Sequence, residues 1–469
     1  MLASVFLLLG SFWIVVNIFF LPFHPWTEGY YRSWLILKGL VPYKDFLWVR
    51  EPLDITFLAW INKLFGLNIL NYQMVMFFLF LLISLVLFFF LKKKSLTLAL
   101  TSYTCYVVFL FPLFLNAEIE EVLVGLFSLL VFFSLWEYTQ KRQTWLLWAA
   151  GICSGLAMMT KLTSAVIVII SWLYLVLTLK QKTKQAVFYL LGVTIPLLIV
   201  ALCLANRGAL DDFLADLYFV VTLYRKWMKP WGIKDGLMMA GLYLAALVPA
   251  VLLHAEKLIA KQIRNLLAMF ILGLLVMLLA SYWSYRLVAS FPLLSIVLGV
   301  LVLEGYHLLR GDKRITEKII LVGSLVVFSF LFSRFGQEYL QFIRDNGFAP
   351  KQYLFDYGEN ELKTATWLRD NTSPNEKIFN MSNNIIMVEA DRLPDNRYVG
   401  GMPCDYLPFE KTAQELSAKP PKVVVLQQTL LDGWPELLNW KFIDFLKKQY
   451  VLQEQFGDIG IYFLNEKRS

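Results

Sequence analysis

Residues 24–68, HPWTEGYYRSWLILKGLVPYKDFLWVREPLDITFLAWINKLFGLN, separate two apolar runs that are each long enough to cross a bilayer. The stretch itself is not expected to span a membrane, because charged residues, glycines and prolines interrupt it throughout. It therefore predicts a long loop at one membrane face, relative to which the rest of the chain can be placed.

The first half of this loop has the pattern of an amphipathic helix. Its apolar face would carry Tyr30, Trp34 and Leu37, which recur at i, i+4 and i+7. Thr27 can cap the start of the helix, and Gly39 can end it.

A second amphipathic helix is expected after Pro52 and before Gly66, with Leu58, Ile61 and Phe65 on one side. Two such helices, joined by an aromatic loop, would lie on the membrane face. Charged residues gather in the same loop, as a site at the bilayer surface requires: Glu28, Arg32, Lys44, Asp45, Arg50, Glu51 and Asp54.

The composition indicates a polytopic membrane protein. Of 469 residues, 58% are hydrophobic and only 17% are charged, whereas soluble chains carry about a quarter charged residues. The formal charge is +8, but the cations mostly occupy short loops between apolar runs. That distribution follows the positive-inside rule and requires no nucleic-acid partner.

The apolar runs predict about eleven transmembrane helices, at about 20 residues each. They cover residues 2–21, 70–91, 95–115, 119–138, 145–160, 163–179, 185–204, 236–254, 265–281, 287–305 and 319–334. The first lacks a basic leader and a cleavage site, so it is expected to be retained. The basic loops would be cytoplasmic, which puts the first outer loop, 22–69, on the opposite side.

Residues 335–469 have the polarity of a soluble domain, and we expect them to form an extracytoplasmic α/β domain after a transmembrane domain of residues 1–334. Short strands are expected at 377–382, 422–428 and 459–465. Helices are expected at 359–370, 409–418 and 435–449.

The cysteines and histidines predict neither a disulfide framework nor a metal site. Cys105, Cys153 and Cys203 fall inside apolar runs, and Cys404 has no partner in its own region. The three histidines lack ligand spacing. No cofactor is indicated, and a divalent metal is possible but not indicated.

Several charged residues allow two interpretations. Glu118, Glu120 and Glu121 open the helix at 119–138, where acids complement the helix dipole. Glu118, however, would face the same compartment as the loop at 22–69, and carboxylates at membrane depth are usually functional. Glu28 has the same alternatives, a capping acid or a reactive carboxylate.

The outward-facing cations are also ambiguous. Lys161 and Arg286 could reach to the interface along their apolar stems, or they could bind a lipid phosphate. The loop at 205–235 mixes Arg225 and Lys226 with aromatic residues, which suits either an ordinary interfacial belt or a phosphate headgroup.

The run E-G-Y-Y…G-L-V-P-Y-K-D-F…E-P-L…L-F-G at 28–66 resembles the first outer loop of the C-type membrane glycosyltransferases. It is most similar to bacterial relatives of protein O-mannosyltransferases and of lipid A aminoarabinose transferase. Further matches along the chain are Glu118, the Thr-Lys turn at Lys161, Arg286 before Pro292, W-L-R-D-N-T at 367–372 and D-N-R-Y at 395–398.

The resemblance implies an enzyme of the cytoplasmic membrane that moves a sugar from a polyprenyl-phosphate donor to an acceptor glycan, lipid or protein on the outer face, with inversion. It departs from the family pattern at Thr27, where the family has the Asp that is commonly assigned as the base. Glu28, Glu118 or Asp45 would then be the base. The donor phosphate would be held by Lys161, Arg286, Arg225 and Lys226, and the acceptor and sugar cavity would be lined by Tyr30, Tyr31, Tyr43, Glu51 and Tyr285.

Two other functions compete with this one. The missing Asp is consistent with an inactive relative that binds or assembles glycolipids. A lipid-linked sugar transporter would need charges at mid-membrane and broken helices in matching halves of the chain, and the sequence shows neither.

The predicted topology can be tested with single cysteines introduced along the chain. A membrane-impermeant thiol reagent added outside intact cells should label position 45 or 430 and should not label position 93 or 182. Labelling at position 93 would overturn the topology and the proposed outer site with it.

Overall fold

The structure is a computed structural model of the chain. It describes residues 2–20, 27–48, 50–110, 118–178, 182–219, 261–280, 287–309, 358–395, 397, 418–427 and 448–465, with single positions at 337, 340, 341, 343, 344 and 446.

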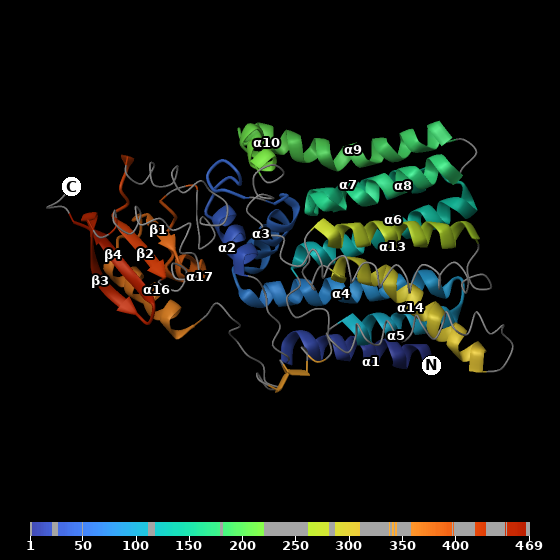
Figure 1. Cartoon of the computed structure of the whole chain (residues 1–469). Coiled ribbons are helices and arrows are strands. Elements are labelled where there is room, and N and C mark those ends of the chain that lie inside the picture. Colours follow the sequence, from blue (N-terminus) through green and yellow to red (C-terminus); the bar gives the residue numbers. More distant parts are fainter. Residues whose placement is uncertain are drawn as a thin grey trace.

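Most described residues of the first 309 form one helical bundle (Figure 1). Its helices are α1 (Leu2–Val15), which continues into the π-helix η1 (Val16–Phe20), α4 (Ile69–Lys92), α5 (Leu96–Leu110), α6 (Ile119–Lys141), α7 (Trp145–Thr160), the 3-10 turn η3 (Leu162–Ser164), α8 (Ala165–Thr178), α9 (Lys182–Asn206), α13 (Lys261–Ala280) and α14 (Leu287–Leu309).

Each predicted span within the described residues is helical. Of the helices described, α4, α6 and α9 are long and apolar enough to cross a membrane by length and composition. The predicted spans at 236–254 and 319–334 lie outside the described residues, so the total of eleven stays a prediction.

Helix α6 lies inside the bundle and packs against α4, α7, α13 and α14. Its apolar side chains are buried along its whole length, and Phe133 stacks on Phe90 with ring centroids 3.7 Å apart. Acidic residues at the start of α6 therefore face protein rather than lipid, which places them where a site can form.

Helices α7 and α9 approach each other closely because glycines line their contact. A Cβ atom at Gly151 would lie 2.2 Å from the carbonyl oxygen of Tyr189, and one at Gly155 would lie 2.5 Å from that of Val193. Small residues spaced four apart let helix backbones meet in this way within membranes.

The first outer loop contains the two expected helices, α2 (Thr27–Leu37) and α3 (Leu53–Phe65). Tyr30 and Trp34 of α2 are buried inside the protein, so this face of the helix packs on protein. The position of both helices at the membrane face stays a prediction. Of the three residues predicted for the apolar side of α3, Leu58 is buried, Ile61 is half-buried and Phe65 is 72% exposed.

The C-terminal residues form a four-stranded mixed sheet. Its elements are α16 (Glu359–Asn371), β1 (Ile378–Met381), α17 (Ile385–Ala390), β2 (Val423–Gln427), β3 (Tyr450–Phe456) and β4 (Ile459–Leu464). The strand order is β1-β2-β4-β3, with β1 and β2 parallel and the other pairs antiparallel. The three predicted strands are present as β1, β2 and β4, and the predicted helix at 359–370 is α16.

Two described elements near the sheet were not predicted. Strand β3 is an edge strand with exposed Val451 and Leu452, so it lacks a clear apolar alternation. Helix α17 is only six residues long. The predicted helices at 409–418 and 435–449 lie almost wholly outside the described residues, and the domain boundary after residue 334 remains a prediction.

A second apolar core joins the first loop to the sheet. It combines Tyr31 and Trp34 of α2 with Ile385 of α17 and Val425 of β2. Helix α10 (Leu210–Phe219), which lies within the predicted loop at 205–235, also belongs to this region through Phe213. The first loop is therefore enclosed by protein on several sides.

The close contact between α7 and α9 predicts that one glycine substitution changes the stability in the direction opposite to the usual one. Gly→Ala inside a helix normally stabilises by about 1 kcal/mol, but Gly151→Ala should lower the melting temperature in detergent because its Cβ meets backbone atoms.

Gly29→Ala in α2 is the matched control. A Cβ there would meet only the Leu58 Cδ2 atom at 3.7 Å, an ordinary contact, so stability should stay the same or rise. A rise in melting temperature for Gly151→Ala would contradict the packing.

Candidate active site

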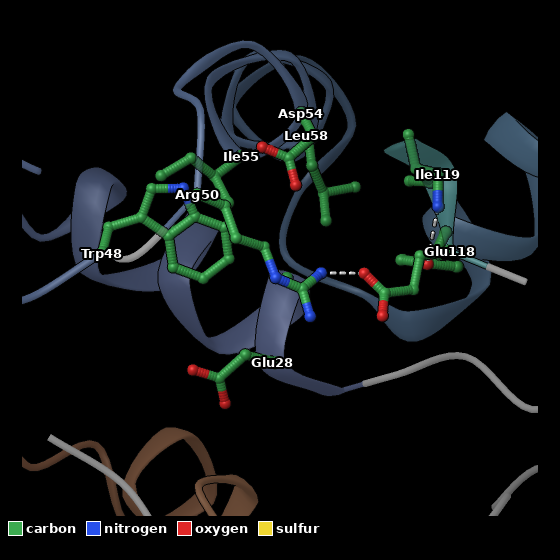
Figure 2. A pocket seen from close by; sticks show the side chains of 10 residues that line it. Glu28, Trp48, Arg50, Asp54, Ile55, Leu58, Glu118 and Ile119 are labelled. Carbon is green, nitrogen blue, oxygen red and sulfur yellow. Dashed lines mark hydrogen bonds and ion pairs between the residues drawn. The ribbon is translucent and has the colours of Figure 1, made fainter. Parts of the chain in front are cut away.

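A pocket opens between α2, α3 and the start of α6 (Figure 2). It encloses about 340 Å³, part of which is open to solvent. Its lining combines apolar walls with charged groups: Glu28, Gly29, Trp48, Arg50, Asp54, Ile55, Leu58, Tyr72, Glu118 and Ile119. Such a mixture of apolar walls and a few convergent polar groups is typical of ligand sites.

Glu118 is the N-cap residue of α6 and is nearly buried. One carboxylate oxygen, Oε2, accepts a hydrogen bond from Arg50 Nη1. The other, Oε1, has no hydrogen-bond partner among the described residues. Burial raises the pKa of Glu118, and the Arg50 guanidinium acts in the opposite direction. The free oxygen is thus a basic group with room for a proton.

Glu28 lines the same pocket, but both of its oxygens are bonded. Arg32 donates to Oε1 from Nε at 2.8 Å and from Nη2 at 2.5 Å. Asn384 Nδ2, from the C-terminal part of the chain, donates to Oε2 at 2.7 Å. The Arg32 guanidinium also lies 5.6 Å from the ring centroid of Trp48. Glu28 is therefore held in one orientation.

Asp54 is a third carboxyl group in the pocket lining, and its Oδ1 has no hydrogen-bond partner among the described residues. Burial raises its pKa well above the ordinary value, and the nearby Glu120 charge raises it further. Both effects favour the protonated form of Asp54, while the Arg50 charge acts in the opposite direction.

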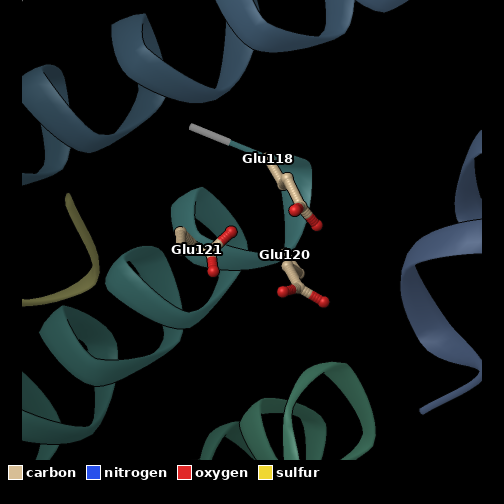
Figure 3. A group of neighbouring side chains, drawn as sticks. All are labelled: Glu118, Glu120 and Glu121. Atoms are coloured by element: carbon tan, nitrogen blue, oxygen red, sulfur yellow. The ribbon is translucent and has the colours of Figure 1, made fainter. Parts of the chain in front are cut away.

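Three glutamates at the start of α6 have carboxylate oxygens within 4.8 Å of one another (Figure 3). Lys161 Nζ lies 2.7 Å from Glu120 Oε1 and also pairs with Glu121. Arg50 Nη1 lies 3.3 Å from the same Glu120 oxygen. A divalent cation would have to displace these cations, so the arrangement fits an ammonium and a guanidinium better than a metal ion.

Glu51 connects the first loop to the turn between α7 and α8. Its Oε1 accepts a hydrogen bond from the Leu162 backbone N–H at 2.5 Å. Burial, reinforced by the Glu120 charge, raises the pKa of Glu51 to about 7. The side chain therefore anchors the loop and is not in the pocket lining.

The structure brings some of the predicted site residues together and separates others. Glu28 and Glu118 line one pocket, as expected for a carboxylate pair. Asp45 does not line it, because its Oδ2 accepts the Val41 backbone N–H at 2.7 Å and closes a tight turn. Lys161 lies outside the lining and is paired within the protein, with 12% of its side chain exposed, so it does not extend to the interface.

The predicted aromatic lining is mostly structural. Tyr30 and Tyr31 are buried in the second core, and Tyr43 packs edge-on against Phe213 while donating a hydrogen bond to the Arg50 carbonyl oxygen at 2.9 Å. Four further predicted site residues lie outside the described residues: Arg225, Lys226, Tyr285 and Arg286.

The charged and aromatic pocket residues that were not among the predicted site residues are Trp48, Arg50, Asp54 and Tyr72. The sequence placed Arg50 and Asp54 in the charged loop without giving them a role. A usable signal was present, because R-E-P-L-D puts a cation just before Pro52 and an acid at the start of the following helix, and so brings both charges to one end of α3.

One family model matches part of the chain, and several solved structures match its fold. Residues 51–205 match the family model described as dolichyl-phosphate-mannose-protein mannosyltransferase. No curated protein matches the sequence.

Solved structures match the fold over almost the whole chain. ArnT from Cupriavidus metallidurans in the apo state matches with a TM-score of 0.60 and 11% identity, over 98% of this chain and 97% of that one. The same protein bound to undecaprenyl phosphate matches with 0.56 and 11%, over the same shares. The oligosaccharyltransferase AglB from Archaeoglobus fulgidus, in complex with an inhibitory peptide and a dolichol-phosphate, matches with 0.51 and 12%, over 99% of this chain and 74% of that one. The predicted resemblance to C-type membrane glycosyltransferases is confirmed.

The raised pKa of Glu51 predicts a pH-dependent stability. The folded state binds this proton more tightly than the unfolded state, so stability is full below about pH 4.5 and falls as the pH rises towards about 7. A shift of this size corresponds to about 3 kcal/mol. Glu51→Gln keeps an oxygen for Leu162 and removes the charge, so its stability gain over the wild type should be larger at pH 8 than at pH 5, in unfolding measured in detergent.

Glu359→Gln, at a side chain that is 80% exposed, serves as the control and should show little of this contrast. A gain for Glu51→Gln that is the same at both pH values would mean that Glu51 titrates normally.

Proposed function

We propose that this chain, which has the fold of the C-type membrane glycosyltransferases, transfers a sugar from a polyprenyl-phosphate donor to an acceptor hydroxyl. The reaction would take place in the pocket between α2, α3 and α6, on the outer face of the cytoplasmic membrane, and would invert the anomeric carbon. One observation carries the proposal: Glu118 has a buried carboxylate oxygen, Oε1, with no partner among the described residues, in a pocket that Arg50 also lines.

Glu118 is suited to be the general base. An acceptor hydroxyl that attacks the anomeric carbon must lose its proton, and a nearby carboxylate of raised pKa accepts it more readily than an ordinary one. Arg50 holds the second oxygen and thereby orients the group. This is the arrangement of a base positioned by a third residue.

The donor side of the reaction needs positive charge. As the acceptor oxygen bonds to the anomeric carbon, the bond from that carbon to the phosphate oxygen breaks, and negative charge builds on the leaving phosphate. Arg50 is the described cation that lines the pocket, and its side chain is 22% exposed. We propose that it meets this charge, together with Arg286, which the sequence predicts for the same role.

Lys161 acquires a different role from the one predicted. Its ammonium pairs with both Glu120 and Glu121, which lowers the negative charge near the departing phosphate by one. Lys161→Gln would remove a positive charge that pairs with two buried carboxylates, so loss of folding rather than a clean loss of turnover is expected.

The donor class is supported by the comparisons. The description of the matched family names dolichyl-phosphate-mannose. Of the solved structures, ArnT was determined with undecaprenyl phosphate and AglB with a dolichol-phosphate. A hydrophobic tail of this kind needs a groove between helices, which a membrane bundle offers. The acceptor is a hydroxyl of a glycan, lipid or protein.

Replacing the proposed base gives the central test. Glu118→Gln should lower kcat at least a hundredfold, because a general base contributes about 10²–10⁴-fold, while binding of the donor changes little. Release of polyprenyl phosphate from a short-chain polyprenyl-phosphate hexose, with an acceptor present, measures this turnover. The wild-type rate should rise with pH, since the base must be unprotonated.

Glu137→Gln is the matched control, because Glu137 is a second carboxylate of α6, ion-paired to Lys141 at 2.7 Å near the other end of the helix. It should keep near-normal turnover. A wild-type protein that binds the donor without releasing phosphate would instead be a glycolipid-binding relative, and one that moves the donor across vesicles unhydrolysed would be a transporter.

A further inference from the structure

Glu28, in the wall of the pocket, accepts a hydrogen bond from a residue far away in the sequence. Asn384 Nδ2 donates to Glu28 Oε2 at 2.7 Å, although 356 residues separate the two. Asn384 is 6% exposed and comes directly before α17 in the C-terminal part of the chain. The wall of the pocket at Glu28 is therefore supported by a segment that belongs to the sheet.

This bond belongs to a longer contact between two helices. Helices α2 and α17 lie side by side (Figure 1). Glu28 meets Asn384 at their starts, and Lys38 Nζ lies 2.6 Å from Asp391 Oδ1 just beyond their ends. Apolar side chains of the second core fill the space between them.

The turn before α17 leaves the Asn384 side chain available for this contact. Asn380 Oδ1 accepts the Ser382 backbone N–H at 3.1 Å and shapes the turn. Asn383 Oδ1 accepts the Ile385 backbone N–H at 3.1 Å and so serves the start of the helix. Asn384 makes no capping bond to its own helix, and its amide points to Glu28 instead.

An amide is well suited to orient a carboxylate. Arg32 already supplies the positive charge at Oε1, so the neutral amide at Oε2 fixes geometry without changing the net charge. A carboxylate oxygen can accept two hydrogen bonds, so Oε2 retains one site for a hydroxyl of a ligand. Loss of the amide would leave that buried oxygen unsatisfied and free to turn.

We propose that Asn384 is a positioning residue that holds Glu28 in the orientation in which its Oε2 atom accepts a hydroxyl of the sugar or the acceptor. The site between α2, α3 and α6 is then complete only when the C-terminal sheet is docked on α2. This inference rests on the proposed transferase function for its effect on turnover, and on the contact itself for its effect on structure.

Two measurements test the proposal: the turnover rate of the enzyme and the rate of backbone hydrogen exchange in α2. Asn384→Ala should lower kcat about tenfold and speed backbone exchange in Thr27–Leu37. Glu28→Gln should also lower kcat, and adding Asn384→Ala to it should cause little further loss, because the amide acts through the carboxylate. Asn371→Ala, on the exposed end of α16, is the matched control and should change neither measurement.

Asn384→Asp adds a readout that a purely structural role would not move. It keeps the shape of the side chain but sets two carboxyl groups against each other, which favours the protonated form of one of them. The acidic limb of the pH–rate profile should therefore move to higher pH, whereas Asn371→Asp should leave it unchanged.

The two readouts separate this inference from the proposed function. Faster exchange in α2 together with normal turnover and an unmoved pH profile would overturn the positioning role and leave a structural contact. Unchanged exchange in Asn384→Ala would overturn the contact itself. A wild type without turnover would count against the transferase function, and unchanged exchange would still count against the contact.

Discussion

The constraint on which the site depends is the cost of burying carboxylates away from water. Glu118, Glu120 and Glu121 open a helix that lies inside the bundle, and such groups must be paired or protonated. Arg50 and Lys161 supply the opposite charges, one from the first loop and one from the turn after α7. Three segments that are distant in sequence are thereby tied together at the outer end of α6.

Polar contacts hold the first loop in place on three sides. Glu51 binds the Leu162 backbone N–H on the side of the bundle, and Asn384 binds Glu28 on the side of the sheet. On a third side, the Leu47 backbone N–H donates to the backbone carbonyl oxygen of Arg397 at 2.8 Å. Because each contact uses a different part of the loop, the loop keeps its shape although it contains little regular structure between its two helices.

The two glutamates in the pocket, Glu28 and Glu118, are suited to different roles. Glu28 is oriented by Arg32 and Asn384, whereas Glu118, beside Arg50, has one oxygen that no described residue contacts by a hydrogen bond. One carboxylate is therefore suited to hold a substrate hydroxyl and the other to remove a proton. The same low-polarity surroundings that make pairing necessary also raise the pKa of Glu118, which makes it a better base.

The sequence by itself determined the helical spans, the presence of α2 and α3 with Gly39 and Gly66 at their ends, and the strands β1, β2 and β4, since these follow from local periodicity and turn residues. It also named Glu28 and Glu118, which both line the pocket. Only the tertiary structure decided that Asp45 closes a turn, that Lys161 pairs with two glutamates, and that Arg50, Asp54 and Asn384 belong at or beside the pocket. These roles depend on pairings between residues up to 356 positions apart, which no local pattern encodes.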